Sequence, residues 1–214
     1  SLFTGEPPWV HGARRAKGKG TKGLVRVSAM REDLPTLAEK MSAAGYRTVT
    51  LSANALLQEE FGLTRGFGSV QYLGHDAAVV DAFDRIVADT DPRPLFLVVN
   101  LMAANEPYRL NPTAPWSAKN RRMLHREHAP ERVKASRIEH VPPALAMSHR
   151  HTHGRPSGAE AVAAGTLKLS PFDRALIHDL YDGELVNLDR SLGTMVRAWN
   201  ESGRGSGIIA VTSD

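Results

Sequence analysis

The chain of 214 residues contains no cysteine. This absence excludes disulfide bonds, thiolate metal sites and a cysteine nucleophile within these residues. No apolar run approaches the roughly 18 residues that a transmembrane helix needs, so the sequence predicts no membrane span. Hydrophobic residues make up 42% of the chain and charged residues 23%. These proportions are ordinary for a globular protein, and the length allows one large domain or two small ones.

The net charge of +4 conceals an uneven distribution. Residues 117–155 contain nine Lys or Arg, three Glu and six of the nine His. A second basic cluster lies near the N-terminus and consists of Arg14, Arg15, Lys17, Lys19 and Lys22. Basic segments attract polyanions that carry phosphate or sulfate groups, but a solvated loop is the simpler explanation of both segments.

Hydrophobic periodicity divides the chain into alternating helices and strands. Residues 1–33 have the glycines and prolines of loops and turns. The spacing of apolar residues predicts helices after an N-cap at Asp33, over 55–61, over 76–88, and from Ser170 to Trp199. Apolar and β-branched runs predict strands over 46–51, 95–102 and 207–214. This order predicts an α/β fold, with three layers (α/β/α) and a largely parallel central sheet.

The final segment, residues 207–214, is the most informative part of the chain. Its apolar run predicts a buried strand that ends on the carboxylate of Asp214. Ligands of open α/β sheets bind outside the carboxyl ends of the strands, so Asp214 is a candidate metal or substrate group. Natural termini are usually exposed and frayed. We therefore expect the chain to be a piece of a longer protein, cut within an active site.

Several short motifs occur in the order that they have in the sulfatase family. Residues 1–5 resemble the end of the family's formylglycine signature, and residues 61–67 resemble its G-x-x-R-G-F-D turn. Residues 211–214 resemble T-S-D-H-G, without its His. Further resemblances cover residues 34–48, 94–108 and 181–193. Each motif is short, and the ordered set covers nearly the whole chain.

The resemblance implies an alkaline-phosphatase-like fold, incomplete at both ends, and a metal-dependent sulfuric ester hydrolase. It makes residues 1–214 one partial catalytic domain, with residues 117–155 as a basic His/Arg-rich insertion. In this family a divalent cation, usually Ca²⁺, holds the sulfate ester while a formylglycine attacks sulfur. Asp214 would be a ligand of the cation, and the nucleophile would lie upstream of Ser1. The implied substrate is an anionic sulfate ester, such as a sulfated glycan that the basic insertion would recruit.

Two positions depart from the pattern of the family. The motif G-K-x-H is replaced here by residues 52–55, Ser-Ala-Asn-Ala, and Asn105 replaces the His of H-x-P-Y. Asn54 and Asn105 are the candidate substrate-binding residues, since an amide can hydrogen-bond a sulfate oxygen. The alternatives are a helix N-cap for Asn54 and a turn position for Asn105. Two other functions remain open: a phosphodiesterase or phosphoglycerol transferase of the same fold, and a catalytically inactive polyanion-binding homologue.

The resemblance implies that His11 packs a loop near the site, so a structural role is the simpler interpretation of this residue. His140, His149, His151 and His153 lie in a Pro/Gly/Arg-rich segment. Such a segment offers no scaffold to hold ligands in tetrahedral geometry, so we predict no metal site there.

Overall fold

A computed structural model describes residues 2–19, 25–105, 108, 164–165, 168–169, 171–205 and 207–213. The chain forms two compact units, Ser1–Met102 with Met195–Asp214, and Ala103–Thr194. That both units belong to one catalytic domain stays a prediction. Among the described residues, no helix is both long and apolar enough to cross a membrane.

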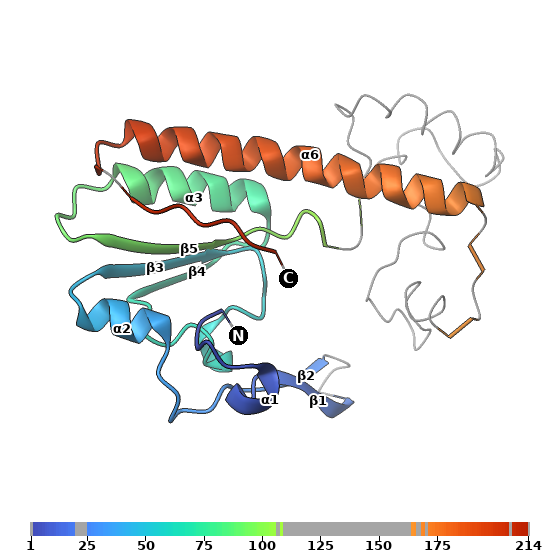
Figure 1. Cartoon of the computed structure of the whole chain (residues 1–214), viewed down its shortest axis with the longest axis horizontal. Coiled ribbons are helices and arrows are strands. Elements are labelled where there is room, and N and C mark those ends of the chain that lie inside the picture. Colours follow the sequence, from blue (N-terminus) through green and yellow to red (C-terminus); the bar gives the residue numbers. More distant parts are fainter. Residues whose placement is uncertain are drawn as a thin grey trace. The chain divides into compact units, whose positions relative to one another are not determined.

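The first unit is built on a parallel sheet of three strands in the order β4-β3-β5 (Figure 1). The central strand β3 (Arg47–Ser52) pairs with β4 (Ser69–Tyr72) on one side and with β5 (Leu95–Asn100) on the other. Ser52 lies opposite both Tyr72 and Asn100, so all strands end at the same edge. The predicted parallel sheet and two of its strands are confirmed. β4 was not predicted because it is short and half polar.

Helix α3 (Asp76–Ala88) connects β4 to β5 and crosses the central strand. Its predicted apolar stripe is confirmed, because Val79, Phe83, Ile86 and Val87 are buried. Full burial of one such side chain contributes about 1.5–3 kcal/mol. α3 lies on one side of the sheet and helix α2 (Leu37–Ala43) on the other (Figure 1). The molecule is therefore a mixed α/β structure with helices packed on both faces of the sheet.

Helix α2 begins after Thr36, and the predicted N-cap at Asp33 is wrong. The Thr36 hydroxyl accepts a hydrogen bond from the Glu39 amide at 3.0 Å, and the Glu39 carboxylate accepts one from the Thr36 amide at 2.7 Å. This reciprocal capping box satisfies two backbone donors that would otherwise lack partners. Asp33 instead forms an exposed ion pair with Arg31.

The G-x-x-R-G-F turn has a structural function in this fold. Gly66 has φ of +90°, and a Cβ added there would lie 2.3 Å from the Glu39 nitrogen. The Arg65 Nε donates to the Glu39 carboxylate at 2.8 Å. The ring of Phe67 stacks on that of Phe96 in β5, with centroids 5.8 Å apart. The turn thus joins α2 to the sheet through close backbone approach, charge and aromatic packing.

The N-terminal region is more regular than its composition indicates. It contains a short helix α1 (Pro8–His11) and an antiparallel pair of strands, β1 (Arg14–Lys19) and β2 (Val25–Ser28). The prediction of loops and turns over residues 1–33 was therefore wrong for these strands. The sequence does not predict this pair, because β1 is basic and has no alternation of apolar and polar residues.

The predicted strand over residues 207–214 is not formed in this structure. Residues 207–213 have no regular secondary structure, and Asp214 lies outside the described residues. The side chain of Ile208 is 98% exposed and that of Val211 is 69% exposed. A strand needs a partner for its backbone groups, and this segment is paired with none of the described strands. The apolar composition of this segment was therefore not sufficient to predict a strand.

The second unit is described mainly through helix α6 (Pro171–Glu201), whose last residues belong to the first unit. The predicted helix from Ser170 to Trp199 is thereby confirmed over its described length. Leu176 and Leu180 are buried on its inner face. The basic insertion over residues 117–155, with its six histidines, lies outside the described residues.

Candidate functional site

The carboxyl edge of the parallel sheet brings Ser52 and Asn100 together. They are the last residues of β3 and β5 and are paired in register. The buried Ser52 hydroxyl lies 3.3 Å from the Asn100 Oδ1 and accepts a hydrogen bond from the Asn54 amide at 2.9 Å. Because ligands of open α/β sheets bind outside this edge, these residues form the candidate site.

Asn54 is the predicted site residue that lies at this edge. It is half-buried, and its Oδ1 accepts a hydrogen bond from the Leu56 amide at 2.9 Å. This contact closes a turn, and Asn54 is not a helix N-cap: the predicted helix over 55–61 is reduced to a single 3₁₀ turn, Glu59–Phe61, whose N-cap is Gln58. The side-chain oxygen of Asn54 stabilises the turn. The side-chain nitrogen, Nδ2, donates to none of the described residues. That nitrogen can donate to a ligand oxygen.

His75 and Asp76, which follow β4 at the same edge, both stabilise the fold. Asp76 accepts a hydrogen bond from the Met102 amide at 2.8 Å, which ties the chain after β5 to the start of α3. His75 caps α3, because its Nδ1 accepts from the Ala78 amide at 3.2 Å.

The loops that follow β3 and β5 give this edge a largely neutral surface. The loops over residues 53–58 and 101–105 contain no charged residue. Hydroxyl and amide oxygens can coordinate a hard cation, and amide nitrogens can bind an oxyanion. No group of three His, Cys, Asp or Glu side chains gathers in the described part of the chain. Ser52, Asn54 and Asn100 can bind a ligand at this edge but cannot transfer a proton near neutral pH.

The positions of the other two predicted site residues relative to this edge stay predictions. Asn105 is exposed and belongs to the second unit. Asp214 lies outside the described residues, so its role as a metal ligand stays a prediction. The sequence reasoning missed Ser52 and Asn100 as partners. Their signal was available, because each is a polar residue that ends an apolar strand at the carboxyl edge.

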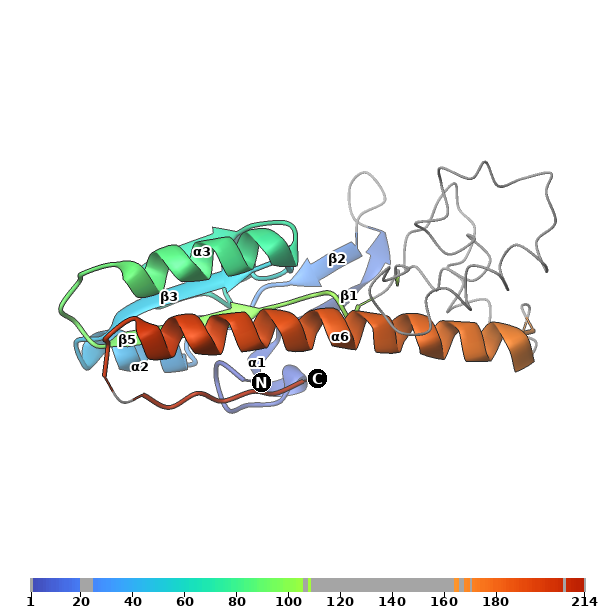
Figure 2. The same cartoon turned by 90° about the horizontal axis from the view of Figure 1, so that it is seen from above.

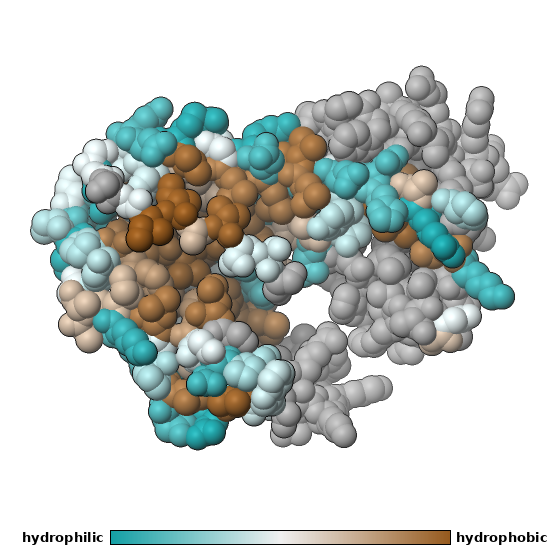
Figure 3. Space-filling view, in the orientation of Figure 1, coloured by the Kyte–Doolittle hydropathy of each residue, from teal (hydrophilic) through white to brown (hydrophobic). Residues whose placement is uncertain are grey.

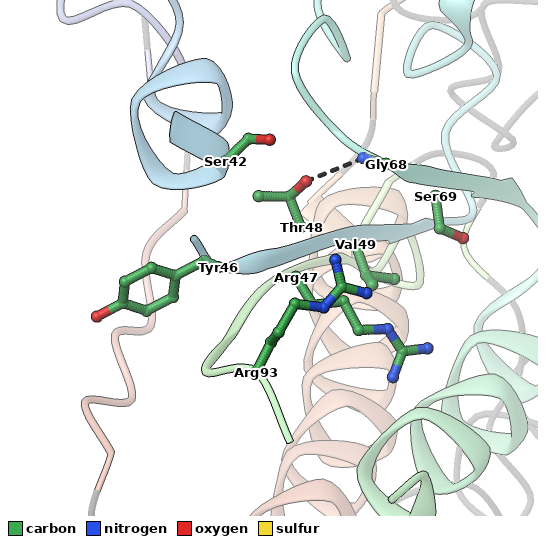
Figure 4. A pocket seen from close by; sticks show the side chains of 8 residues that line it. All are labelled: Ser42, Tyr46, Arg47, Thr48, Val49, Gly68, Ser69 and Arg93. Atoms are coloured by element: carbon green, nitrogen blue, oxygen red, sulfur yellow. Dashed lines mark hydrogen bonds between the residues drawn. The ribbon is translucent and has the colours of Figure 1, made fainter. Parts of the chain in front are cut away.

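The opposite, amino edge of the sheet holds a cavity of about 210 Å³ (Figure 4). Arg47 and Arg93 line it, together with neutral side chains. Arg47 Nη1 lies 2.9 Å from Asp89 Oδ2, off the direction of a hydrogen bond. Arg93 Nη2 lies 2.6 Å from Asp91 Oδ2. The two cations of the cavity therefore already have carboxylate partners.

The electrostatics of the amino edge are those of a structural ion-pair cluster. The hydrogen bond from the Arg93 guanidinium holds the pKa of Asp91 far below its ordinary value, and Asp91 in turn raises the pKa of Arg93. The side chain of Arg47 is only 17% exposed, so its charge needs the nearby acids. Two cations and two anions leave no net charge to attract an anionic ligand.

His11 has the structural environment that the sequence predicts. Its side chain is buried, and its Nδ1 accepts a hydrogen bond from the Ala13 amide at 3.1 Å. Burial lowers the pKa of the imidazole, because the charged form would lose its hydration. The neutral ring therefore packs against the end of α1.

No protein-family model matches this chain, and no curated protein or solved structure is significantly similar to it.

Proposed function

We propose that this chain is part of a metal-dependent sulfuric ester hydrolase of the sulfatase type, with its nucleophile upstream of Ser1. The ordered motifs of the sequence motivate the proposal. The structural observation that supports it is the meeting of Ser52, Asn54 and Asn100 at the carboxyl edge of a parallel sheet. That edge is where an α/β hydrolase of this kind binds its ester.

The residues of the chain would divide between substrate and cation. Asn54 would donate its amide nitrogen to a sulfate oxygen, and Asn105 would supply a second contact of the same kind. Asp214 would be a carboxylate ligand of Ca²⁺. The described residues do not by themselves form a calcium shell, since no group of three acidic or histidine side chains gathers among them. Acidic groups from Asp214 and from residues upstream of Ser1 would have to complete it.

A second candidate is a catalytically inactive homologue that binds polyanions. The positions of the family's Lys and His are Ala53 and Ala55, and Ala53 is buried in the core. The paired strands β1 and β2 include the basic residues Arg14, Arg15, Lys17, Lys19 and Arg26. This function would need neither a nucleophile nor a cation. A phosphodiesterase or phosphoglycerol transferase would instead differ in the residue type of its nucleophile.

The test uses the complete gene product, assayed on an aryl sulfate and a phosphodiester with and without Ca²⁺. Sulfatase function predicts sulfate release that requires Ca²⁺ and falls at least about 100-fold in Asp214→Asn. Asp91→Asn, at the amino edge, is the matched control and should keep full activity. Phosphodiester cleavage alone would favour the related transferases. Polyanion binding without hydrolysis or Ca²⁺ dependence would favour the inactive homologue.

A further inference from the structure

The cavity at the amino edge of the sheet contains a guanidinium group whose charge is balanced but which donates no hydrogen bond to the described residues. Arg47 Nη1 lies 2.9 Å from Asp89 Oδ2, and Arg47 Nε lies 4.0 Å from Asp91 Oδ2. The first contact lacks the direction of a hydrogen bond, and the second is too long for one. Most buried polar groups of native proteins have a hydrogen-bond partner. The side chain of Arg47, only 17% exposed, is therefore suited to donate to a bound molecule.

Two hydroxyl groups of the cavity also have unused hydrogen-bonding capacity. Ser42 lines the cavity from α2, and its hydroxyl bonds to none of the described residues. Ser69 lines it from β4, and its hydroxyl accepts from the Gln71 side chain at 3.3 Å but donates to no described residue. The Thr48 hydroxyl, in contrast, already donates to a backbone carbonyl and accepts from a backbone amide, each at 2.9 Å. The cavity thus offers unused donors and acceptors from α2, β3 and β4.

The cavity lies at the end of the first unit that is opposite to the candidate site. The C-terminal end of α2, the loop from α3 to β5 and the amino ends of the strands meet there in both views (Figures 1 and 2). Strand β3 separates Arg47 from Ser52 by about 16 Å, at about 3.3 Å per residue. A small molecule in this cavity would not reach the carboxyl edge, so the inference goes beyond the proposed function and does not depend on it.

The charge and polarity of the cavity restrict the class of molecule that it can bind. Arg47 and Arg93 are balanced by Asp89 and Asp91, so an anion gains no attraction from net charge. The lining is mostly polar, with Val49 as its aliphatic member. Figure 3 shows mainly hydrophilic or weakly apolar surface at this end of the first unit, whereas strongly apolar surface gathers nearer its middle. The complementary molecule is therefore polar and uncharged.

The size of the cavity and the types of its polar groups restrict the class further. Its volume of about 210 Å³ equals that of roughly seven water molecules at about 30 Å³ each, which suits one small ring or a short polyol. Arg47 can only donate, whereas the hydroxyls of Ser42 and Ser69 both donate and accept. Hydroxyl groups of a ligand can pair with both kinds of group. In Figure 4 the ring of Tyr46 points away from the guanidinium groups, so hydrogen bonds and not stacking would hold the molecule.

We propose that the cavity at the amino edge binds a small, uncharged, polyhydroxylated molecule of the size of a monosaccharide. Arg47 donates hydrogen bonds to its hydroxyl oxygens, and Ser42 and Ser69 exchange hydrogen bonds with it from α2 and β4. The ion pairs with Asp89 and Asp91 hold the guanidinium charged and in position. Because a few hydrogen bonds without net charge give weak binding, we expect a Kd of about 1–10 mM.

The first test titrates the unmodified chain with D-glucose and, separately, with myo-inositol, and follows the protein by NMR. Binding predicts saturable shifts of the Arg47 Nε–H signal and of the Gly68 and Ser69 backbone amides, with one common Kd for each polyol. Sugars also affect proteins by exclusion from the surface, and that effect does not saturate. Shifts that only grow linearly, or the absence of shifts with both polyols, would overturn the proposal.

Inorganic sulfate, titrated at constant ionic strength, tests the argument from charge. The proposal predicts that sulfate shifts the Arg47 signal with an affinity at least about 10-fold lower than that of the better polyol. A sulfate affinity equal to or higher than that of the polyols would overturn the assignment to uncharged molecules.

Two matched substitutions at the end of α2 test where the molecule binds. Ser42 is exposed and lines the cavity, so Ser42→Phe should obstruct it and weaken polyol binding at least about 10-fold. Ala43→Phe is the control, because Ala43 is the next residue of the helix, is equally exposed and does not line the cavity. It should bind like the unmodified chain. Equal affinities of the two variants would overturn the proposal.

Arg47→Lys tests the guanidinium itself. Lysine keeps a cation beside Asp89 but loses the planar set of donors, so polyol affinity should fall at least about 10-fold. An unchanged affinity in the folded variant would show that the guanidinium does not bind the molecule and would overturn the proposal. If Arg47→Lys does not fold, the comparison of Ser42→Phe with Ala43→Phe remains decisive, since both positions are exposed.

Discussion

The polar side chains at the two ends of the parallel sheet are stabilised by different interactions. At the amino end, Arg47 and Arg93 are matched by Asp89 and Asp91. At the carboxyl end, Ser52 hydrogen-bonds neutral amides. The charges of the amino end are satisfied internally, so they stabilise the fold and leave little attraction for a ligand. The carboxyl end keeps uncharged donors and acceptors that a charged ligand could use.

The largest expected effect comes from the turn that holds the amino half of β3. The Gly66 carbonyl accepts a hydrogen bond from the Thr48 hydroxyl at 2.9 Å. Gly66→Ala should destabilise the protein by about 2–5 kcal/mol, because the positive φ is strained and the new Cβ meets the Glu39 backbone. Urea denaturation measures the change. Gly74→Ala is the control: Gly74 also has positive φ, but its Cβ would meet nothing, and a comparable loss there would contradict close approach as the cause.

At the carboxyl end, removal of the Ser52 hydroxyl tests whether neutral hydrogen bonds hold the site. Ser52→Ala leaves the half-buried backbone amide of Asn54 without its acceptor, which should cost about 1–3 kcal/mol. Ser69→Ala, at the start of β4, is the control and should cost less, since that hydroxyl accepts only from a Gln71 side chain. Equal losses in urea denaturation would show that Ser52 has no special role.

At the amino end, Arg47→Met tests whether the ion pairs are structural. The aliphatic part of the side chain is retained, so the loss of about 1–2 kcal/mol reflects the unpaired carboxylate of Asp89. Because the pair is partly shielded from solvent, the wild-type advantage should persist at high salt. Urea denaturation at low and high NaCl measures both quantities. Loss of the whole difference at high salt would indicate a screened surface pair instead.

The smallest expected effect is on the pH dependence of stability. The pKa of Asp91 is lowered in the folded state from 3.8, so its stabilising contribution is present above that value and is lost as the pH falls below it. Asp91→Asn should therefore make the thermal midpoint less sensitive to acid below about pH 4. Asp84→Asn, an exposed position on α3, is the control. Identical acid profiles for the wild type and Asp91→Asn would contradict the lowered pKa.

The elements that the sequence predicted correctly share a strong local pattern. The helical spacing of Val79, Phe83 and Val87 specified α3, and the apolar run over residues 95–100 specified β5. The sequence did not predict β4, because its pairing with β3, and not its own composition, makes it a strand. The segment over residues 207–213 shows the converse, since its composition predicts a strand that only a partner could form.

The candidate site could be predicted only in part, for a similar reason. Asn54 was identified through the motif that it interrupts, and it does lie at the carboxyl edge. The pairing of Ser52 with Asn100, 48 positions apart in the chain, depends on the register of β3 and β5. No local pattern encodes that register. Asn105 and Asp214 were identified by motif alone, and the described part of the sheet edge includes neither.

The hydrogen bond from Arg204 to the Val87 carbonyl has a consequence for the order of folding. The two residues are separated by 117 positions in the chain. During synthesis α3 emerges with its last carbonyls uncapped, and the cation that complements its C-terminus follows only after the whole of Ala103–Thr194. Contacts between such distant residues slow folding, because a long loop must close first. The first unit should therefore reach its full stability late, after the second unit has left the ribosome.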